Sequence, residues 1–401
     1  MNLEPFLLLK RYCEAEGFRG WDPYDGLNSR VFQAIPLLKR SALCRLVVIQ
    51  GFKRCPVNLR RLALVPKEYN AKGIGLFLQG YCNLLRAVRE TPALEKELGT
   101  QSELTARIKE LADLLIRLRS KGDYHGACWG YNFDWQARRL FLFPKFTPTV
   151  VATNFCATAL MEAYEATGCR NYLDTALSAA EFVMRDLHRT PFNGGFLFSY
   201  SPLEGNDTVF NASLLGSRLL SYCYHYTRDE RYKEAARMSV AACCSAQNPD
   251  GSWVYGMLPV QSWIDSFHTG YNLDGLIAYE EMTGDTTFRD HIERGFRFYI
   301  ENFFEPDGCP KYYHNQTYPI DIHCPGQLFV TLCRLHRFRE HHALAEKVLD
   351  WTILHMQDKR GYFYYQLKKG ISSKIPYMRW SNAFMFNALS YYILGNGRQE
   401  D

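Results

Sequence analysis

The sequence contains no apolar run of the roughly 18 residues that a membrane-spanning helix requires. Its start, Met1 to Lys10, also lacks the basic segment and the small-residue cleavage site of a secretory signal peptide. The 13 cysteines are scattered without a CxxC pair, a pattern typical of reduced, buried thiols rather than of a disulfide framework. We therefore expect a cytoplasmic protein, peripheral at the inner membrane if it contacts a membrane at all.

Motifs for cofactors and metals are missing as well. There is no Gly-rich phosphate-binding loop, no HExxH zinc motif and no acidic motif of terpene cyclases. Cys324 follows His323, but no second cysteine stands at a zinc-ligand spacing from them. We expect neither a metal ion nor an organic cofactor, and no nucleic-acid partner.

The composition is that of an ordinary globular protein, with 47% hydrophobic and 22% charged residues. Aromatic residues reach 15%, with 26 Tyr, 26 Phe and 7 Trp. They indicate either many core anchors or a cleft in which rings stack on sugar faces.

Positive charge is concentrated near the N-terminus. Ten Lys or Arg residues lie from Arg30 to Lys72, against one acid, Glu68. They alternate with apolar residues, so residues 30–72 are a candidate for contact with an anionic membrane surface or an acidic partner. The default interpretation is a solvated outer helix.

From about residue 148 the chain repeats one unit: a helix, a short turn, a second helix and a Gly-aromatic loop. The turns have three or four residues, which makes the two helices antiparallel neighbours. The expected first helices span residues 148–166, 208–226, 266–282, 321–336 and 379–394, and the second helices span 172–187, 230–247, 287–303 and 341–357.

Polar residues recur near the start of each first helix. The steps between them are 57, 57, 55 and 57 residues, for Asn154, Asn211, His268, His323 and Trp380. An earlier helix pair is expected at 70–88 and 101–119, with Asn70 at its start. An open solenoid would have the same period but usually has shorter repeats and needs polar caps.

This pattern yields six first helices and five second ones, so the sixth partner is expected from the N-terminal segment, at Phe32–Gln50. We predict an all-α fold, an (α/α)6 toroid with short β-hairpin loops at one end, closed by pairing the C-terminal inner helix with an N-terminal outer helix. The expected division is a basic extension at 1–69 and the remainder of the toroid at 70–401, in one structural domain.

Two neighbouring repeats each place an aspartate shortly before a histidine: Asp265 with His268, and Asp321 with His323. A carboxylate can orient an imidazole and hold its tautomer, which suits acid–base catalysis. Aspartates at helix starts also serve as ordinary N-caps. The recurrence at one register favours the catalytic interpretation.

Further candidates lie in the loops and at the helix starts that should converge on one pocket. Arg379 and the helix N-termini suit a sugar carboxylate, and the tryptophans suit sugar rings, although each residue also fits ordinary packing. The additional catalytic candidates are Tyr255 and Asp134, and the substrate-binding candidates are Asn70, Trp129, Tyr131, Asn154, Asn211, Trp253, Lys311, Tyr312, Arg379 and Trp380.

The sequence resembles the six-hairpin glycosidase-type superfamily. It is most similar to cytoplasmic toroid proteins encoded in bacterial exopolysaccharide and O-antigen clusters. The segments that carry the resemblance are 58–60, 69–72, 129–134, 250–256, 263–271, 319–323 and 377–380. The resemblance implies a toroid acting on a glycan or glycan precursor in bacterial polysaccharide biosynthesis, but not a particular reaction.

Three functions remain open. A uronate lyase or C5-epimerase would hold the carboxylate through amides and Arg379, and would move protons through His268, His323 or Tyr255. A glycoside hydrolase would need two opposed carboxylates, Asp134 with Asp265 or Asp321. A non-catalytic glycan-binding protein at the inner membrane face is the third. Uronate chemistry is favoured because amides and imidazoles outnumber acids at the recurring positions.

Overall fold

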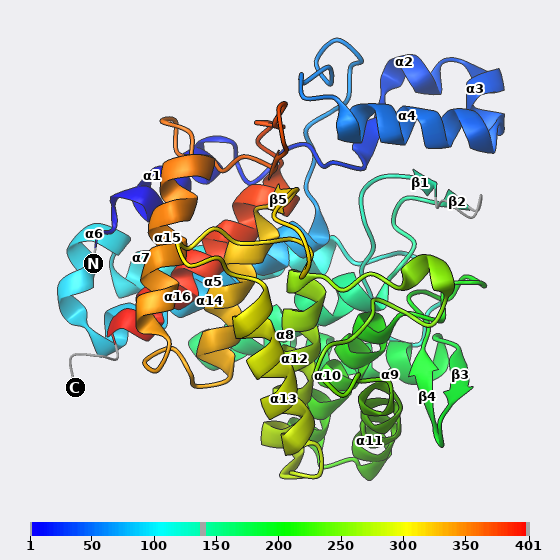
Figure 1. The fold of residues 1–401 in the computed structure, drawn as a ribbon, viewed down its shortest axis with the longest axis vertical. Helices are drawn as coiled ribbons and strands as arrows, with labels where there is room; N and C mark the ends of the chain where they lie inside the picture. The colour runs from blue at the N-terminus through cyan, green and yellow to red at the C-terminus, as the bar shows by residue number, and fades with distance from the viewer. Residues whose placement is uncertain (1, 137–141, 398–401) are drawn as a thin grey trace.

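The computed structural model describes residues 2–136 and 142–397. Within these ranges, six largely buried helices surround a common axis (Figure 1): α5 (Ala71–Glu90), α8 (Val150–Thr167), α10 (Phe210–Thr227), α12 (Ser266–Thr283), α14 (His323–Arg334) and α16 (Phe384–Gly397), the last preceded by the π-helical turn η4 (Met378–Ala383). Each contacts the next in chain order, and α16 contacts α5, so the inner ring is closed.

The outer layer follows the predicted alternation. Each of five outer helices packs against the inner helix before it: α7 (Gln101–Arg117), α9 (Arg170–Arg185), α11 (Glu230–Ser245), α13 (Arg289–Asn302) and α15 (His342–Met356). The sixth, α1 (Glu4–Ala15), packs against α16, where the rings of Phe6 and Phe386 lie 5.1 Å apart. The predicted all-α toroid, closed by an N-terminal outer helix, is confirmed.

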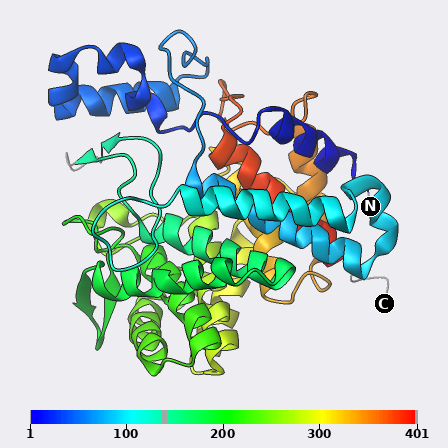
Figure 2. The ribbon, with the colours of Figure 1, turned by 180° about the vertical axis from the view of Figure 1, so that it is seen from behind.

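The prediction that Phe32–Gln50 forms this closing helix was wrong. Residues 30–54 instead form α2 (Arg30–Gln33), α3 (Pro36–Arg40) and α4 (Ala42–Arg54). They stand off the ring as a separate lobe in both views (Figures 1 and 2). The reason is apolar surface: α1 buries Phe6, Leu9 and Cys13, whereas α4 buries only Ile49. Helix pairing follows the buried apolar stripe.

Local sequence explains where the inner helices start and stop. Thr149 caps α8 and Asp265 caps α12, each accepting a hydrogen bond from a first-turn amide. Gly168 and Gly284 end these helices in the left-handed conformation, with φ of 70° and 74°. Arg228 takes the same role after α10 with φ of 58°. These caps produce the short turns between inner and outer helices.

The connections contain little regular structure. Three antiparallel strand pairs are described: β1 (Trp135–Gln136) with β2 (Leu142–Phe143), β3 (Arg189–Phe192) with β4 (Gly195–Phe198), and β5 (Ile320–Asp321) with β6 (Gln366–Leu367). The remaining short helices are η1 (Asp25–Asn28), η2 (Pro92–Leu94), α6 (Glu95–Leu98) and η3 (Pro259–Gln261). Among the Gly-aromatic loops that follow the second helices, the loop after α9 contains the β3–β4 hairpin.

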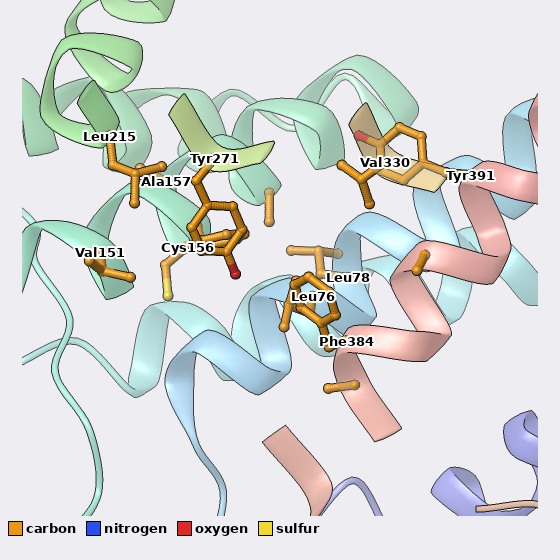
Figure 3. Close-up of a cluster of buried hydrophobic side chains, with 14 of the residues drawn as sticks. Leu76, Leu78, Val151, Cys156, Ala157, Leu215, Tyr271, Val330, Phe384 and Tyr391 are labelled. Atoms are coloured by element: carbon orange, nitrogen blue, oxygen red, sulfur yellow. The ribbon is translucent and has the colours of Figure 1, made fainter. Parts of the chain in front are cut away.

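The core lies along the ring axis. Figure 3 shows side chains from all six inner helices meeting there, among them Leu76, Val151, Leu215, Tyr271, Val330 and Phe384. The core therefore fixes six helix N-termini around one end of the axis.

Of the helices in the described ranges, none is both long enough and apolar enough to cross a bilayer.

Candidate functional site

A network of aromatic rings gathers where α12, α14 and η4 begin. The ring of Phe267 lies 5.1 Å from His323, 5.6 Å from Tyr312 and 6.2 Å from Trp380. Tyr312 and Trp380 are half-buried, so the network has an accessible surface. Flat, partly exposed rings of this kind suit the apolar faces of sugars.

The Asp265–His268 pair lies at the edge of this network. His268 Nδ1 lies 2.8 Å from Asp265 Oδ2, which also accepts a 2.9 Å hydrogen bond from the indole nitrogen of Trp263. Tyr255 stacks on Trp263 at 4.5 Å and lies 4.7 Å from the ring of His268. The carboxylate is fully buried, while 19% of the imidazole is exposed. A carboxylate at Nδ1 keeps a proton on that nitrogen and leaves Nε2 free to accept one.

The second pair has a different character. Asp321 accepts hydrogen bonds from the indole of Trp380 at 2.9 Å and from the side-chain amide of Gln366 at 3.1 Å. His323 Nδ1 lies 3.6 Å from Asp321, beyond a hydrogen bond, and its ring stacks on Phe384 at 4.0 Å. Burial lowers the pKa of His323 to about 4, although Asp321 opposes this. The imidazole is therefore neutral at pH 7.

Arg379 reaches the same region but is already paired. Its guanidinium binds both carboxylate oxygens of Asp22, with distances of 2.5 and 2.8 Å. Both side chains are 5% exposed, and the guanidinium lies 5.0 Å from the ring of Tyr131. Burial and Asp22 act in opposite directions on the pKa of Arg379, and Asp22 prevails, raising it. Little of this positive charge remains for a substrate.

Lys72, expected as part of the basic segment at 30–72, is instead buried and is the second cation of this region. Its Nζ lies 3.4 Å from the hydroxyl of Tyr271 and 4.1 Å from the ring centre of Phe155. Burial, and then the charge of Arg379, hold the pKa of Lys72 well below its usual value. Among the described residues, no carboxylate forms an ion pair with Lys72. A lysine inside an otherwise apolar helix start was the available signal in the sequence.

Three amide candidates sit at the helix starts. Asn70 caps α5 and donates a 2.8 Å hydrogen bond to Asn132. Asn154 and Asn211 are buried, and the amide oxygen of each has no partner among the described residues. Asn154 is the fifth residue of α8, whereas Asn211 is the second of α10. Equal spacing in sequence therefore does not place them at equal depth.

Four other candidates lie outside the aromatic network. Trp129 and Trp253 are buried, and their indole nitrogens donate to backbone carbonyls at 2.8 and 3.0 Å. Lys311 donates to a backbone carbonyl at 3.1 Å, and Asp134 accepts from a backbone amide at 2.8 Å. These contacts hold the loops in place.

The N-terminal segment covers one side of the site. Tyr24 lies 5.7 Å from Trp380 and 6.3 Å from Trp135, and Asp22 holds Arg379. The segment is itself tied down by a buried 2.7 Å ion pair between Arg60 and Asp25. No sequence pattern linked these residues to the pocket. Within the described part of the chain, no group of three His, Cys, Asp or Glu residues could hold a metal ion.

Comparison with known proteins supports the fold. No family model and no curated protein matches the chain. Among solved structures, a sugar epimerase from a ruminal bacterium matches with a TM-score of 0.60 and 12% identity, covering 84% of this chain and 90% of that one. A cellobiose 2-epimerase from Bacillus thermoamylovorans also has a TM-score of 0.60, at 13% identity, covering 84% of this chain and 90% of that one. A GH76 α-mannanase from Bacteroides thetaiotaomicron has a TM-score of 0.60 and 13% identity over 82% and 87%. These structural similarities show that the chain shares the toroid fold with these proteins.

Proposed function

We propose that the protein is a carbohydrate-active enzyme that moves a proton at a sugar carbon, as a lyase or C5-epimerase of a uronic acid. The observation that carries the proposal is the Asp265–His268 pair, whose buried carboxylate leaves His268 Nε2 as a base beside the aromatic rings of Tyr255 and Phe267.

In the proposed reaction, His268 Nε2 takes the C5 proton, and the electron pair left behind spreads into the sugar carboxylate. A sugar carboxylate beside Lys72 would favour protonation of its amine, and the resulting ammonium group would balance this negative charge. Tyr271 is suited to return a proton, because burial raises the pKa of its hydroxyl well above the ordinary value. Its ring lies 6.1 Å from that of His268. Reprotonation at C5 from the opposite face gives the epimer.

A lyase would share the first step. The C4–O bond would then break with its electron pair, leaving a C4–C5 double bond, and the departing oxygen would take a proton. Two-carboxylate hydrolysis finds less support, because the side chains of Asp265 and Asp321 are at most 1% exposed and hydrogen-bonded to tryptophans. The solved neighbours, two epimerases and a mannanase, support a carbohydrate substrate. The resemblance to exopolysaccharide proteins supports a bacterial polysaccharide or its precursor.

The test is hydrogen exchange in D2O with uronate-containing glycans, followed by NMR at C5 and by ultraviolet absorbance of the unsaturated product. We expect H268Q to lower the rate about 10²–10⁴-fold, the usual contribution of a general base. His225→Gln, an exposed histidine on α10, is the matched control and should retain the rate. Exchange at the wild-type rate in H268Q would rule out His268 as the base. Glycan binding without exchange or turnover in the wild type would favour a binding protein.

We also propose that the lobe formed by α2, α3 and α4 contacts an anionic membrane surface. No acid occurs between Asp25 and Glu68. Large apolar side chains are nevertheless exposed there, including Leu37 at 80%, Leu43 at 66% and Leu62 at 80%. Exposed apolar groups interleaved with basic ones suit the interface of an anionic bilayer. The lobe adjoins the segment that supplies Asp22 and Tyr24, so this contact would bring the pocket close to membrane-linked glycans.

A further inference from the structure

A second polar cluster lies among α10, α12 and α14, further along these helices than the aromatic network. The hydroxyl of Tyr222 on α10 accepts a 3.3 Å hydrogen bond from Arg334 on α14. These two helices are separated in the ring by α12, so the bond joins inner helices that are not adjacent. Arg218 follows Asn211 along α10 by roughly two turns, so about 10 Å of helix separates the two residues. The cluster is therefore distinct from the proposed catalytic site.

Arg218 is buried without an acceptor. It is 2% exposed, its Nε has no hydrogen-bond partner, and among the described residues no carboxylate forms an ion pair with it. Its guanidinium carries five N–H donors and a permanent charge. Burying such a group without a partner is strongly unfavourable.

The neighbouring groups offset the charge of Arg218 only in part. Arg334 lies close enough to lower the pKa of Arg218, after the larger effect of burial. Asp274 lies 3.9 Å from Arg334 and already accepts 3.0 Å hydrogen bonds from Gln327 and Thr331. A second acid, Glu162, also acts on Arg334 but pairs with Arg86 at 3.2 Å. The three guanidinium groups of Arg86, Arg218 and Arg334 thus face the two carboxylates of Asp274 and Glu162, and one positive charge is left uncompensated.

We propose that Arg218 and Arg334 bind a small monovalent inorganic anion among α10, α12 and α14, with chloride as the representative ion. The single surplus charge favours a monovalent ion, and the surrounding inner helices favour a small one. The ion would accept hydrogen bonds from Arg218 and hold α10 against α14. This role is separate from the chemistry of the pocket and stabilises the ring.

Bromide replaces chloride and is visible by anomalous diffraction, so crystals of the full chain soaked in sodium bromide test the site directly. We expect an anomalous peak within hydrogen-bond distance of Arg218. The melting temperature should also be about 2–4 °C higher in sodium chloride than in sodium isethionate, whose anion is bulkier, at equal ionic strength.

The variant R218Q should lose this chloride-dependent rise, whereas R231Q, which changes an exposed arginine of α11, should keep it. A bromide peak confined to the protein surface, an adventitious ion only, would overturn the proposal. An equal chloride response in R218Q would overturn it too. If R218Q does not fold, the bromide position in the wild type decides.

Discussion

At Lys72, burial and the charge of Arg379 both disfavour the protonated amine. The ammonium group sits among Phe155 and Tyr271 at 4% exposure, and its pKa is well below the usual lysine value. A folded state that disfavours the protonated form is destabilised whenever the unfolded chain remains protonated. The protein therefore keeps a buried lysine at the expense of stability, as functional sites often do.

This leads to a prediction about pH. Because the folded-state pKa is lowered, the unfolding free energy of the wild type should rise with pH between that lowered pKa and about 10.4, the unfolded value, by up to about 1.4 kcal/mol per unit. K72M should be more stable than the wild type at pH 7, and the difference should vanish near the upper limit. Urea denaturation at a series of pH values measures this.

Lys359→Met, at an exposed position, is the control and should show no such trend. The proposed reaction adds a second readout, since K72M should lose C5 exchange while gaining stability. A K72M protein that is less stable than the wild type at pH 7 would contradict the account of Lys72.

Single residues were predictable where their partners are close in sequence. The three-residue spacing of Asp265 and His268 puts both on the first turn of one helix, so their pairing follows from helix geometry. Arg379 and Asp22 are 357 positions apart, and no local pattern indicates that they meet. The prediction that Arg379 is available for a sugar carboxylate did not anticipate that partner.

At the scale of elements, the lobe of α2, α3 and α4 presents apolar surface to solvent. On α4, Leu43 and Val47 are 66% and 61% exposed and lie one turn apart, so they form an outward stripe. An outer helix of the ring would turn such a stripe inward. The orientation seen here matches a helix that contacts another surface.

We expect the protein to sediment with anionic vesicles and not with neutral ones, and more weakly as salt rises. Leu37→Ser should reduce the bound fraction several-fold, because a buried leucine contributes about 1.5–3 kcal/mol. The matched control is Leu354→Ser on α15, since Leu354 is 78% exposed and Leu37 is 80% exposed. Equal losses in both variants, or no vesicle binding at low salt, would remove the membrane proposal.

At the scale of the whole molecule, closure of the ring depends on α1. Phe6 is 3% exposed and packs on Phe386, whose ring also contacts Phe77 and Tyr81 of α5. The N-terminal helix therefore covers the seam where the last inner helix meets the first. A contact between the two ends of the chain makes the toroid one cooperative unit.

F6A should lower the unfolding free energy by about 3–5 kcal/mol, as for other buried phenylalanines. Phe146→Ala, at a phenylalanine that is 47% exposed, is the control and should change it by less than about 0.5 kcal/mol. Guanidinium denaturation followed by circular dichroism compares them. Similar effects of the two substitutions would mean that α1 does not secure the seam.

By itself, the sequence determined the helix order, the short turns and the fact that the ring closes, because apolar periodicity and left-handed caps act within a few residues. It also identified the Asp265–His268 pair, whose geometry is local. The tertiary structure decided which N-terminal segment closes the ring, that Asp22 neutralises Arg379, and that Lys72 and Arg218 are buried. Those outcomes depend on which surfaces meet across hundreds of residues, where burial and charge are properties of the assembled ring.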